Sequence, residues 1–325
     1  MNGITPPPRA RLFLAFSAIY IIWGSSYLGI RVAIETIPPF LMAGVRFVIA
    51  GAILYVLARA RGAAPPARGH WPPSVVLGTL LLVGGNGTVV WAEQWLPSGL
   101  TSLIVSLEPI WIVILLWLGP RRARPEWRVV FGMLWGFAGA ALFVSPAELV
   151  RGPRVDITGA LVLIGGSVSW ACGALYSRGA KLPASAPLAT AMQMLAGGAI
   201  LLALGNARGE WRLLNLAGVS HRSLVALVYL IVFAGVITFT AFIWLLRVTS
   251  PAVVATHGFV NPVVAVFLGW ALAGEPVTPR TILASAVIVS AVALVVTARG
   301  GEPAAEIAQA GEEPRAIASR SPGEV

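Results

Sequence analysis

The stretch GLTSLIVSLEPIWIVILLWL, residues 99–118, is an apolar run long enough to cross a lipid bilayer, with Glu108 and Pro109 near its middle. A carboxylate at the depth of the hydrocarbon core is costly, so acids in such spans usually face a cavity or a partner. Proline removes a backbone hydrogen bond and bends the helix. Glu108, roughly 15 Å into its span, therefore marks a candidate functional site.

The composition indicates a polytopic membrane protein. The 325 residues are 57% hydrophobic and 11% charged, with a mean hydropathy of +0.83, whereas soluble domains carry about 25% charged residues. The net charge of +10 does not indicate nucleic acid, because the basic residues lie between apolar runs. Cys172 is the single cysteine, which excludes an internal disulfide and a cysteine metal cluster.

Apolar runs of about 20 residues predict an all-α integral membrane protein with ten transmembrane helices. The predicted spans are 12–31, 39–58, 74–92, 98–118, 127–145, 157–176, 187–205, 223–245, 251–273 and 280–297. The first run is too long for the apolar region of a cleavable signal peptide. Thr278-Pro279 is typical of an N-cap followed by proline at the first position of the last helix.

Lys and Arg are more frequent in the segments on the side of the N-terminus, with a cluster after the fourth span, which predicts cytoplasmic N- and C-termini. The expected organisation is a cytoplasmic N-terminus (1–11), a first repeat (12–145), a second repeat (157–297) and a disordered cytoplasmic tail (298–325).

The two halves resemble each other in sequence. AGVRFVIAGAIL at 43–54 aligns with TAMQMLAGGAIL at 190–201, and Glu108-Pro109 aligns with Asn261-Pro262. Trp23 aligns with Trp170. Each half contains five predicted spans, so the halves cross the membrane in opposite directions. Inverted repeats are a transporter architecture, in which the substrate site lies near the midplane between the halves.

Several motifs together resemble the EamA family of the drug/metabolite transporter superfamily, most closely its YedA-type inner-membrane permeases. They are IIWGSSYLGIRVAIETIPPFLMAGVRF at 21–47, Pro-Ser-Gly-Leu at 97–100, Glu108-Pro109, Val-Asn-Pro-Val at 260–263 and Gly-Glu-Pro at 274–276. The resemblance implies ten helices in two inverted five-helix halves and export of amino acids or related metabolites. One departure is that Gly274-Glu275 corresponds to Gly119-Pro120 in the first half.

Two matching polar-proline pairs predict the centre of the site. Glu108 could carry a proton, bind a substrate ammonium or do both; alternatively it is a protonated carboxyl bonded to a neighbouring helix. Asn261 could line the site or only join helices. His257 lies one turn before Asn261 on the same face and could relay a proton, or it could be a neutral hydrogen-bonding group.

Further polar and aromatic residues are predicted near this site, each with a packing alternative. Arg46 could bind a substrate carboxylate or pair with Glu108, or its guanidinium could extend to the membrane interface. An aromatic wall with a few polar groups suits an amphipathic substrate. The remaining predicted site residues are Trp23, Ser26, Tyr27, Asn86, Trp170 and Gln193.

The predicted function is a permease for small organic metabolites that works by alternating access, with proton coupling as one hypothesis. The resemblance favours export, and amino acids or amphipathic compounds over sugars. The first alternative is an uncoupled facilitator. The second alternative, from another class of protein, is a channel or membrane scaffold. No nucleotide-binding or hydrolase motif is present, so we expect no enzyme activity, cofactor or metal. The small-residue face Gly132, Gly136 and Gly139 is expected to pack helices or the subunits of a homodimer.

Overall fold

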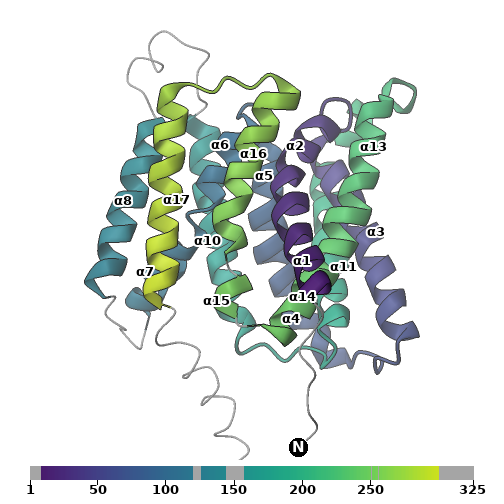
Figure 1. Cartoon of the computed structure of the whole chain (residues 1–325). Coiled ribbons are helices and arrows are strands. Elements are labelled where there is room, and N and C mark those ends of the chain that lie inside the picture. Colours follow the sequence, from purple (N-terminus) through teal and green to yellow (C-terminus); the bar gives the residue numbers. More distant parts are fainter. Residues whose placement is uncertain (1–8, 120–125, 144–156, 250, 255, 300–325) are drawn as a thin grey trace, which may run out of the picture.

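The fold is a bundle of helices (Figure 1). The computed structural model describes residues 9–119, 126–143, 157–249, 251–254 and 256–299, and over these ranges it contains helices and no strand. Seven helical segments are long and apolar enough to cross a membrane, and Val260–Ala273 and Pro279–Leu294 are shorter apolar helices. The chain is therefore a multi-pass membrane protein; the number of ten spans and their inverted orientation stay predictions. The predicted tail from residue 300 onward lies outside the described residues.

Helix is present at each of the ten predicted segments, although several segments combine short helices of different type. The η1, η3 and η5 elements are π-helices, and η2 and η4 are 3₁₀ turns. The elements are α1 (Arg9–Ser17), η1 (Ala18–Ile22), α2 (Trp23–Ala33), α3 (Pro39–Ala60), η2 (Arg68–His70), α4 (Trp71–Leu77), η3 (Gly78–Gly87), α5 (Thr88–Ala92), α6 (Ser98–Val105), α7 (Glu108–Leu118), α8 (Trp127–Phe143), α10 (Ile157–Ser177), α11 (Ala186–Ala207), α12 (Glu210–Leu213), η4 (Leu216–Gly218), α13 (His221–Tyr229), η5 (Leu230–Ile237), α14 (Thr238–Val248), α15 (Pro251–Val254), α16 (His257–Ala273) and α17 (Pro279–Arg299).

The main helix packings join the first half of the chain to the second half. Helix α3 packs along α11, and α8 packs along α17 at one edge of the bundle (Figure 1). Helix α2 contacts α13 and α16, while α10 contacts η3 and α7. In the predicted repeat α2 and α10 hold equivalent positions, and each packs against the opposite half. This exchange is the arrangement expected of two related halves around a shared centre.

Small residues set the closest of these crossings. A Cβ at Gly44 of α3 would lie 2.7 Å from the Leu202 side chain, and one at Gly198 of α11 would lie 2.9 Å from the Val48 nitrogen. In α8, a Cβ at Gly136 or Gly139 would meet side chains of α7 and α17 at 2.7 to 2.8 Å. The predicted small-residue face of this helix therefore packs helices within the chain, as membrane helices do where backbones approach closely.

Two helices of the first half receive their N-terminal caps from the second half. Helices α3 and α6 follow Pro38 and Pro97, whose side chains cannot cap a helix. Glu210 accepts hydrogen bonds from the Phe40 and Leu41 nitrogens at 3.3 and 2.9 Å. Glu275 accepts from the Ser98 nitrogen and Oγ at 2.8 Å each, and from the Gly99 nitrogen at 3.2 Å. Carboxylates suit these positions because helix N-termini present free N–H groups and a partial positive charge.

Both caps lie at the end of the bundle opposite to the N-terminus, which we call the distal end (top of Figure 1). Other bonds between the halves lie there too. The Ser220 nitrogen donates to Thr36 Oγ1 at 3.1 Å, and Ser223 Oγ donates to the Val32 carbonyl at 2.8 Å. Gly274 ends α16 with φ at 66°, a left-handed conformation that glycine adopts readily, and so turns the chain toward Glu275. At the distal end, hydrogen bonds thus join the two halves of the chain.

Replacing Glu275 by Ala is expected to lower the free energy of unfolding by about 1–3 kcal/mol, because three donors at the start of α6 lose their acceptor. Thermal unfolding in detergent, followed by gel filtration, measures this change. Glu35→Ala is the matched control, since Glu35 is an exposed carboxylate at the same end. Equal stability of the two variants would contradict the capping role.

Candidate functional site

Glu108 starts α7 directly after a break in the fourth apolar segment. Helix α6 ends at Val105, and Pro109 at the second position of α7 has no N–H to give to the Val105 carbonyl. Trp170 of α10 lies near Glu108, so that its indole N–H can interact with the carboxyl group. The acid of the first half is therefore close to an aromatic residue of the second half. Two predicted site residues meet here.

Tyr27 of α2 is a third predicted site residue in this region. Its phenol group lies within electrostatic reach of both Glu108 and Glu93. Its helix neighbour Ser25 bonds to the Tyr229 hydroxyl at 2.6 Å, which fixes α2 against α13. A phenol can donate to one carboxylate and accept from a ligand, so Tyr27 can connect two polar positions of one pathway.

Arg46 of α3 is buried, with 4% of its surface exposed, and its guanidinium carbon lies 4.8 Å from the centre of the Phe47 ring. Extension of its side chain to the membrane interface is therefore not the observed arrangement. The charge of Glu93, and not that of Glu108, acts on Arg46. Glu93 lies in the turn between α5 and α6 and is 0% exposed. The structure thus places a buried guanidinium and a buried carboxyl group near the distal end, and burial raises the pKa of Glu93 well above its usual value.

Unpartnered polar atoms within the described ranges gather in the first half. Buried side-chain atoms without a hydrogen-bond partner are Arg46 Nε and Nη1, both Glu93 oxygens, Thr101 Oγ1 and Trp111 Nε1. Glu108 and Trp111 are three residues apart in α7, a spacing that places them on one side of that helix. Buried polar groups in proteins are nearly always hydrogen-bonded. A group of unpaired ones is therefore consistent with a site that binds a polar ligand.

A second group of predicted residues forms an aromatic cluster between α2, α14 and α16. Trp23 lies 5.2 Å from the ring centres of Phe239, Phe242 and His257. The Trp23 Nε1 donates to the Ala234 carbonyl at 3.2 Å, and His257 Nδ1 lies 2.9 Å from the Val254 carbonyl. These partners are backbone groups, so the cluster holds the first apolar segment against the second half.

Asn261 joins α16 to the π-helix η1. Its amide nitrogen is within 3.2, 3.1 and 3.2 Å of the carbonyls of Tyr20, Ile19 and His257, and this surrounding fixes which amide atom is nitrogen. A π-helix shifts the usual pairing of carbonyls, which suits such side-chain donation. The contact favours a helix-joining role for Asn261, the alternative to binding substrate. The role of Asn261 in substrate binding stays a prediction.

The other predicted residues bond within their own helices. Ser26 Oγ donates to the Trp23 carbonyl at 2.6 Å, and Asn86 Nδ2 donates to the Leu81 carbonyl at 3.5 Å in η3. Gln193 is partly buried on α11, where its backbone carbonyl would lie 2.7 Å from a Cβ at Gly78. These three residues are not brought together with Glu108 by any contact that we observe.

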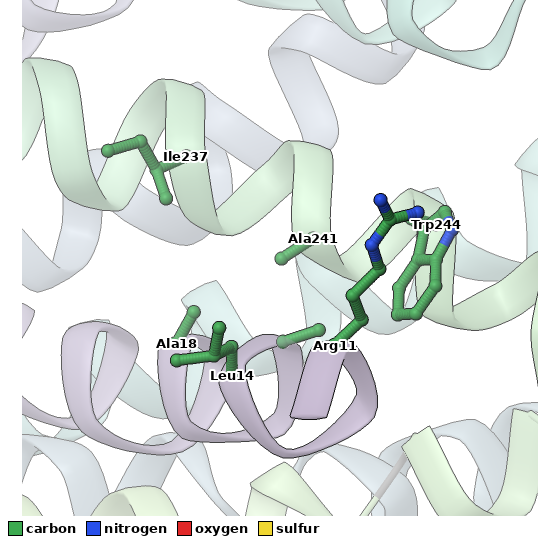
Figure 2. Close-up of a pocket in the computed structure, with 7 residues that line it drawn as sticks. Arg11, Leu14, Ala18, Ile237, Ala241 and Trp244 are labelled. Atoms are coloured by element: carbon green, nitrogen blue, oxygen red, sulfur yellow. The ribbon is translucent and has the colours of Figure 1, made fainter. Parts of the chain in front are cut away.

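An apolar groove of about 300 Å³ lies between the α1–η1 and η5–α14 segments, away from Glu108 (Figure 2). Leu14 and Ala18 face Ile237 and Ala241 across it, and Arg11 lies beside Trp244 at one end (Figure 2). None of the predicted site residues lines this groove. Its apolar walls offer a polar substrate few partners, so we place the candidate site at Glu108 and the unpartnered residues near it.

Sequence reasoning missed Glu93. The residue directly follows the apolar run 74–92 and therefore resembles an exposed loop acid. The signal that could have found it is the sequence after it: Gln94 is followed by Trp95, Leu96 and Pro97, so the chain remains apolar beyond the acid. In the structure, Arg31 at the end of α2 also contacts this segment, because it donates to the backbone carbonyl of Glu93.

Comparison with known proteins agrees with this architecture. The model of the EamA-like transporter family matches residues 11–145 and 157–297, which is most of the chain. The chain belongs to this family. The two matched segments correspond closely to the halves whose helices pack against each other.

Curated relatives of this chain are transporters by name. The uncharacterised inner membrane transporter YedA of Escherichia coli (strain K12) is 38% identical over 286 residues, covering 87% of this chain and 90% of YedA. A probable amino-acid metabolite efflux pump of Salmonella typhimurium is 24% identical over 196 residues, covering 58% of this chain and 60% of that protein. A solved crystal structure with 24% identity has a TM-score of 0.61 over 88% of this chain and 98% of its own, which shows the fold.

Proposed function

We propose that the protein is an inner-membrane exporter of small organic metabolites, of the amino-acid or amphipathic class, that works by alternating access between its two halves. The observation that carries the proposal is Glu108, an acid at the break between α6 and α7 whose side chain lies near Trp170 of the other half. Broken helices at a contact between repeats are where transporters bind substrate.

The packing of the halves supports this mechanism. Helix α2 packs on α13 and α16 of the second half, and α10 packs on η3 and α7 of the first half. The π-helices η3 and η5 lie in the third and eighth predicted spans, at nearly equivalent positions of the repeat. If the halves are inverted, rocking one against the other exposes Glu108 alternately to the two sides of the membrane. The bonds of Glu210 and Glu275 across the distal end then correspond to an inward-directed or occluded state.

The membrane and the substrate class are supported by the relatives. YedA is named an inner membrane transporter, and another relative is named a probable amino-acid metabolite efflux pump. The aromatic groups at Trp170 and Trp111 beside an acid suit a molecule with an apolar body and an amino group. A proton on Glu108 is the proposed coupling ion, and the N- and C-termini are proposed to be cytoplasmic.

Export is tested by comparing the metabolites in the medium of cells that overexpress the protein with those of deletion cells and of cells expressing Glu108→Gln. The expected result is one or a few amines or amino acids that accumulate outside only in cells with the wild-type protein. Glu126→Gln, an exposed carboxylate at the start of α8, serves as the control and should behave as wild type. Identical media in all strains would contradict the proposal.

A further inference from the structure

Two helical stripes face each other across the apolar groove of Figure 2. Each stripe is a set of residues that recur every three or four positions and so share one face of a helix. The α1–η1 stripe and the η5–α14 stripe consist of Arg11, Leu14, Ala15 and Ala18, and of Ile237, Ala241 and Trp244. Each stripe covers about 10 Å along its helix axis. The groove therefore has the shape of a slot between two neighbouring helices.

Small residues make the hollow of this slot, and larger ones form its rims. Alanine stands at positions 15, 18 and 241, whereas Leu14 and Ile237 are 66% and 42% exposed. Both walls belong to helical segments that are long and apolar enough to cross a membrane, Arg9–Ala33 and His221–Leu246. The exposed rims thus face lipid, and an acyl chain fills such a slot more favourably than water does.

One end of the groove lies at the edge of the membrane. Arg11 is the third residue of the segment Arg9–Ala33, and Trp244 is the third residue from the end of His221–Leu246. Figure 2 shows these two side chains together at the same end of the groove. Tryptophan and arginine favour this level of a bilayer, because their polar groups reach the lipid headgroups while their apolar parts stay in the hydrocarbon.

The positive charge at this end has no counterpart on the elements that form the groove. No Asp or Glu occurs in α1, η1, η5 or α14, and Arg11 forms no ion pair with another described residue. Arg9, exposed at the start of α1, adds a second positive charge two residues away. The groove thus joins an apolar slot to a basic end, and its complement is a molecule with an apolar chain and an anionic head.

We propose that the groove binds one anionic phospholipid, with an acyl chain lying along the alanines and the phosphate at Arg11. Basic residues at a membrane edge attract anionic lipid headgroups. A free anion would leave the apolar walls uncovered, and a lipid without net charge would leave the charge of Arg11 uncompensated. The groove lies away from Glu108, so this lipid site does not depend on which metabolite the protein transports.

Native mass spectrometry of the purified full-length protein in detergent tests the site. The probes are phosphatidylglycerol and phosphatidylcholine with identical acyl chains, each added in a titration. The wild type should bind its first phosphatidylglycerol about fivefold more tightly than phosphatidylcholine. Arg11→Gln should remove this preference, whereas Arg11→Lys should keep most of it. Ala241→Leu, which fills the slot, should weaken the binding of both lipids severalfold.

Two exposed residues outside the groove provide matched controls. Arg178→Gln, after α10, and Ala10→Leu, on α1, should both bind lipid as the wild type does. If Ala241→Leu is not monodisperse in gel filtration, Ala18→Leu fills the same slot.

Equal lipid preference in the wild type and Arg11→Gln would overturn the headgroup contact. Unchanged binding by the variant that fills the slot would overturn the placement of the acyl chain. A dimer of the wild type that dissociates in Ala241→Leu would show that a second copy of the chain covers the groove, which would also overturn the proposal.

Discussion

Flux driven by a pH gradient is expected to fall at least about tenfold when Glu108 is replaced by Gln. The substitution keeps the size of the side chain and an acceptor for the Trp170 indole, but it cannot release or bind a proton. The measurement uses purified protein in vesicles loaded with the metabolite identified in the export experiment, with an imposed pH difference across the membrane.

The reason for a large effect is the position of Glu108. Its carboxyl is at the break between two helices, near Trp170 of the opposite half. A group that contacts both halves can be exposed to either side when they rock, so its protonation can be tied to the conformational change. His257, the other predicted proton carrier, contacts aromatic rings and a backbone carbonyl instead. His257→Gln should therefore reduce pH-driven flux much less than Glu108→Gln does.

Two further measurements separate coupling from uncoupled facilitation. A coupled wild type concentrates its substrate above equilibrium when a pH gradient is imposed, whereas a facilitator only lets the substrate equilibrate. Exchange of labelled for unlabelled substrate without a gradient should survive in Glu108→Gln, provided that the residue carries the proton and is not essential for substrate binding. Full pH-driven accumulation by Glu108→Gln would show that the proton role is wrong. Glu126→Gln, exposed on α8, controls for loss of an acidic charge.

The sequence predicted the helical segments because long apolar runs leave few alternatives in a membrane. Glu108 was predictable for the same reason, since an acid near the middle of such a run stands out. The helix caps that the second half gives to the first half were not predictable. Glu210 and Glu275 bond to helices 169 to 177 residues away, and no local pattern shows which helix start a loop carboxylate will reach.

The site residues stay predictions, but their contacts can be compared with the arrangement that the repeat suggests. The repeat pairs Glu108 with Asn261, but the structure uses the Asn261 amide to bond carbonyls of η1 and brings Glu108 to Trp170. A π-helix depends on tertiary contacts more than on local propensity. The sequence therefore does not show that the carbonyls of Tyr20 and Ile19 need a hydrogen-bond donor. Glu93 was not predicted as a site residue, because hydropathy alone assigns an acid after a span to a solvent-exposed loop. Packing instead buries it completely.

Replacing Gly166 by Leu is expected to lower the free energy of unfolding by about 3 kcal/mol, the upper range for overpacking a tightly packed helix contact. A Cβ at this position of α10 would lie 2.0 Å from Thr88 Oγ1 and 2.9 Å from the Gly84 carbonyl oxygen. The hydroxyl cannot simply rotate away at no cost, because it donates to the Gly84 and Gly85 carbonyls at 2.7 and 2.6 Å. The Gly84 carbonyl oxygen belongs to the backbone of η3, so it cannot move without moving that helix.

The adjacent Gly165 is a matched control in the same helix. A Cβ there would meet nothing within 4 Å, and the residue is exposed on the outer face of α10. Gly165→Leu should therefore change stability by no more than about 0.5 kcal/mol. Thermal unfolding in detergent should separate the two variants by roughly 4–5 °C. Equal unfolding temperatures would mean that α10 and η3 are not in contact at Gly84 and Gly166. Because α10 carries Trp170, that result would also remove the support for the contact between Trp170 and Glu108.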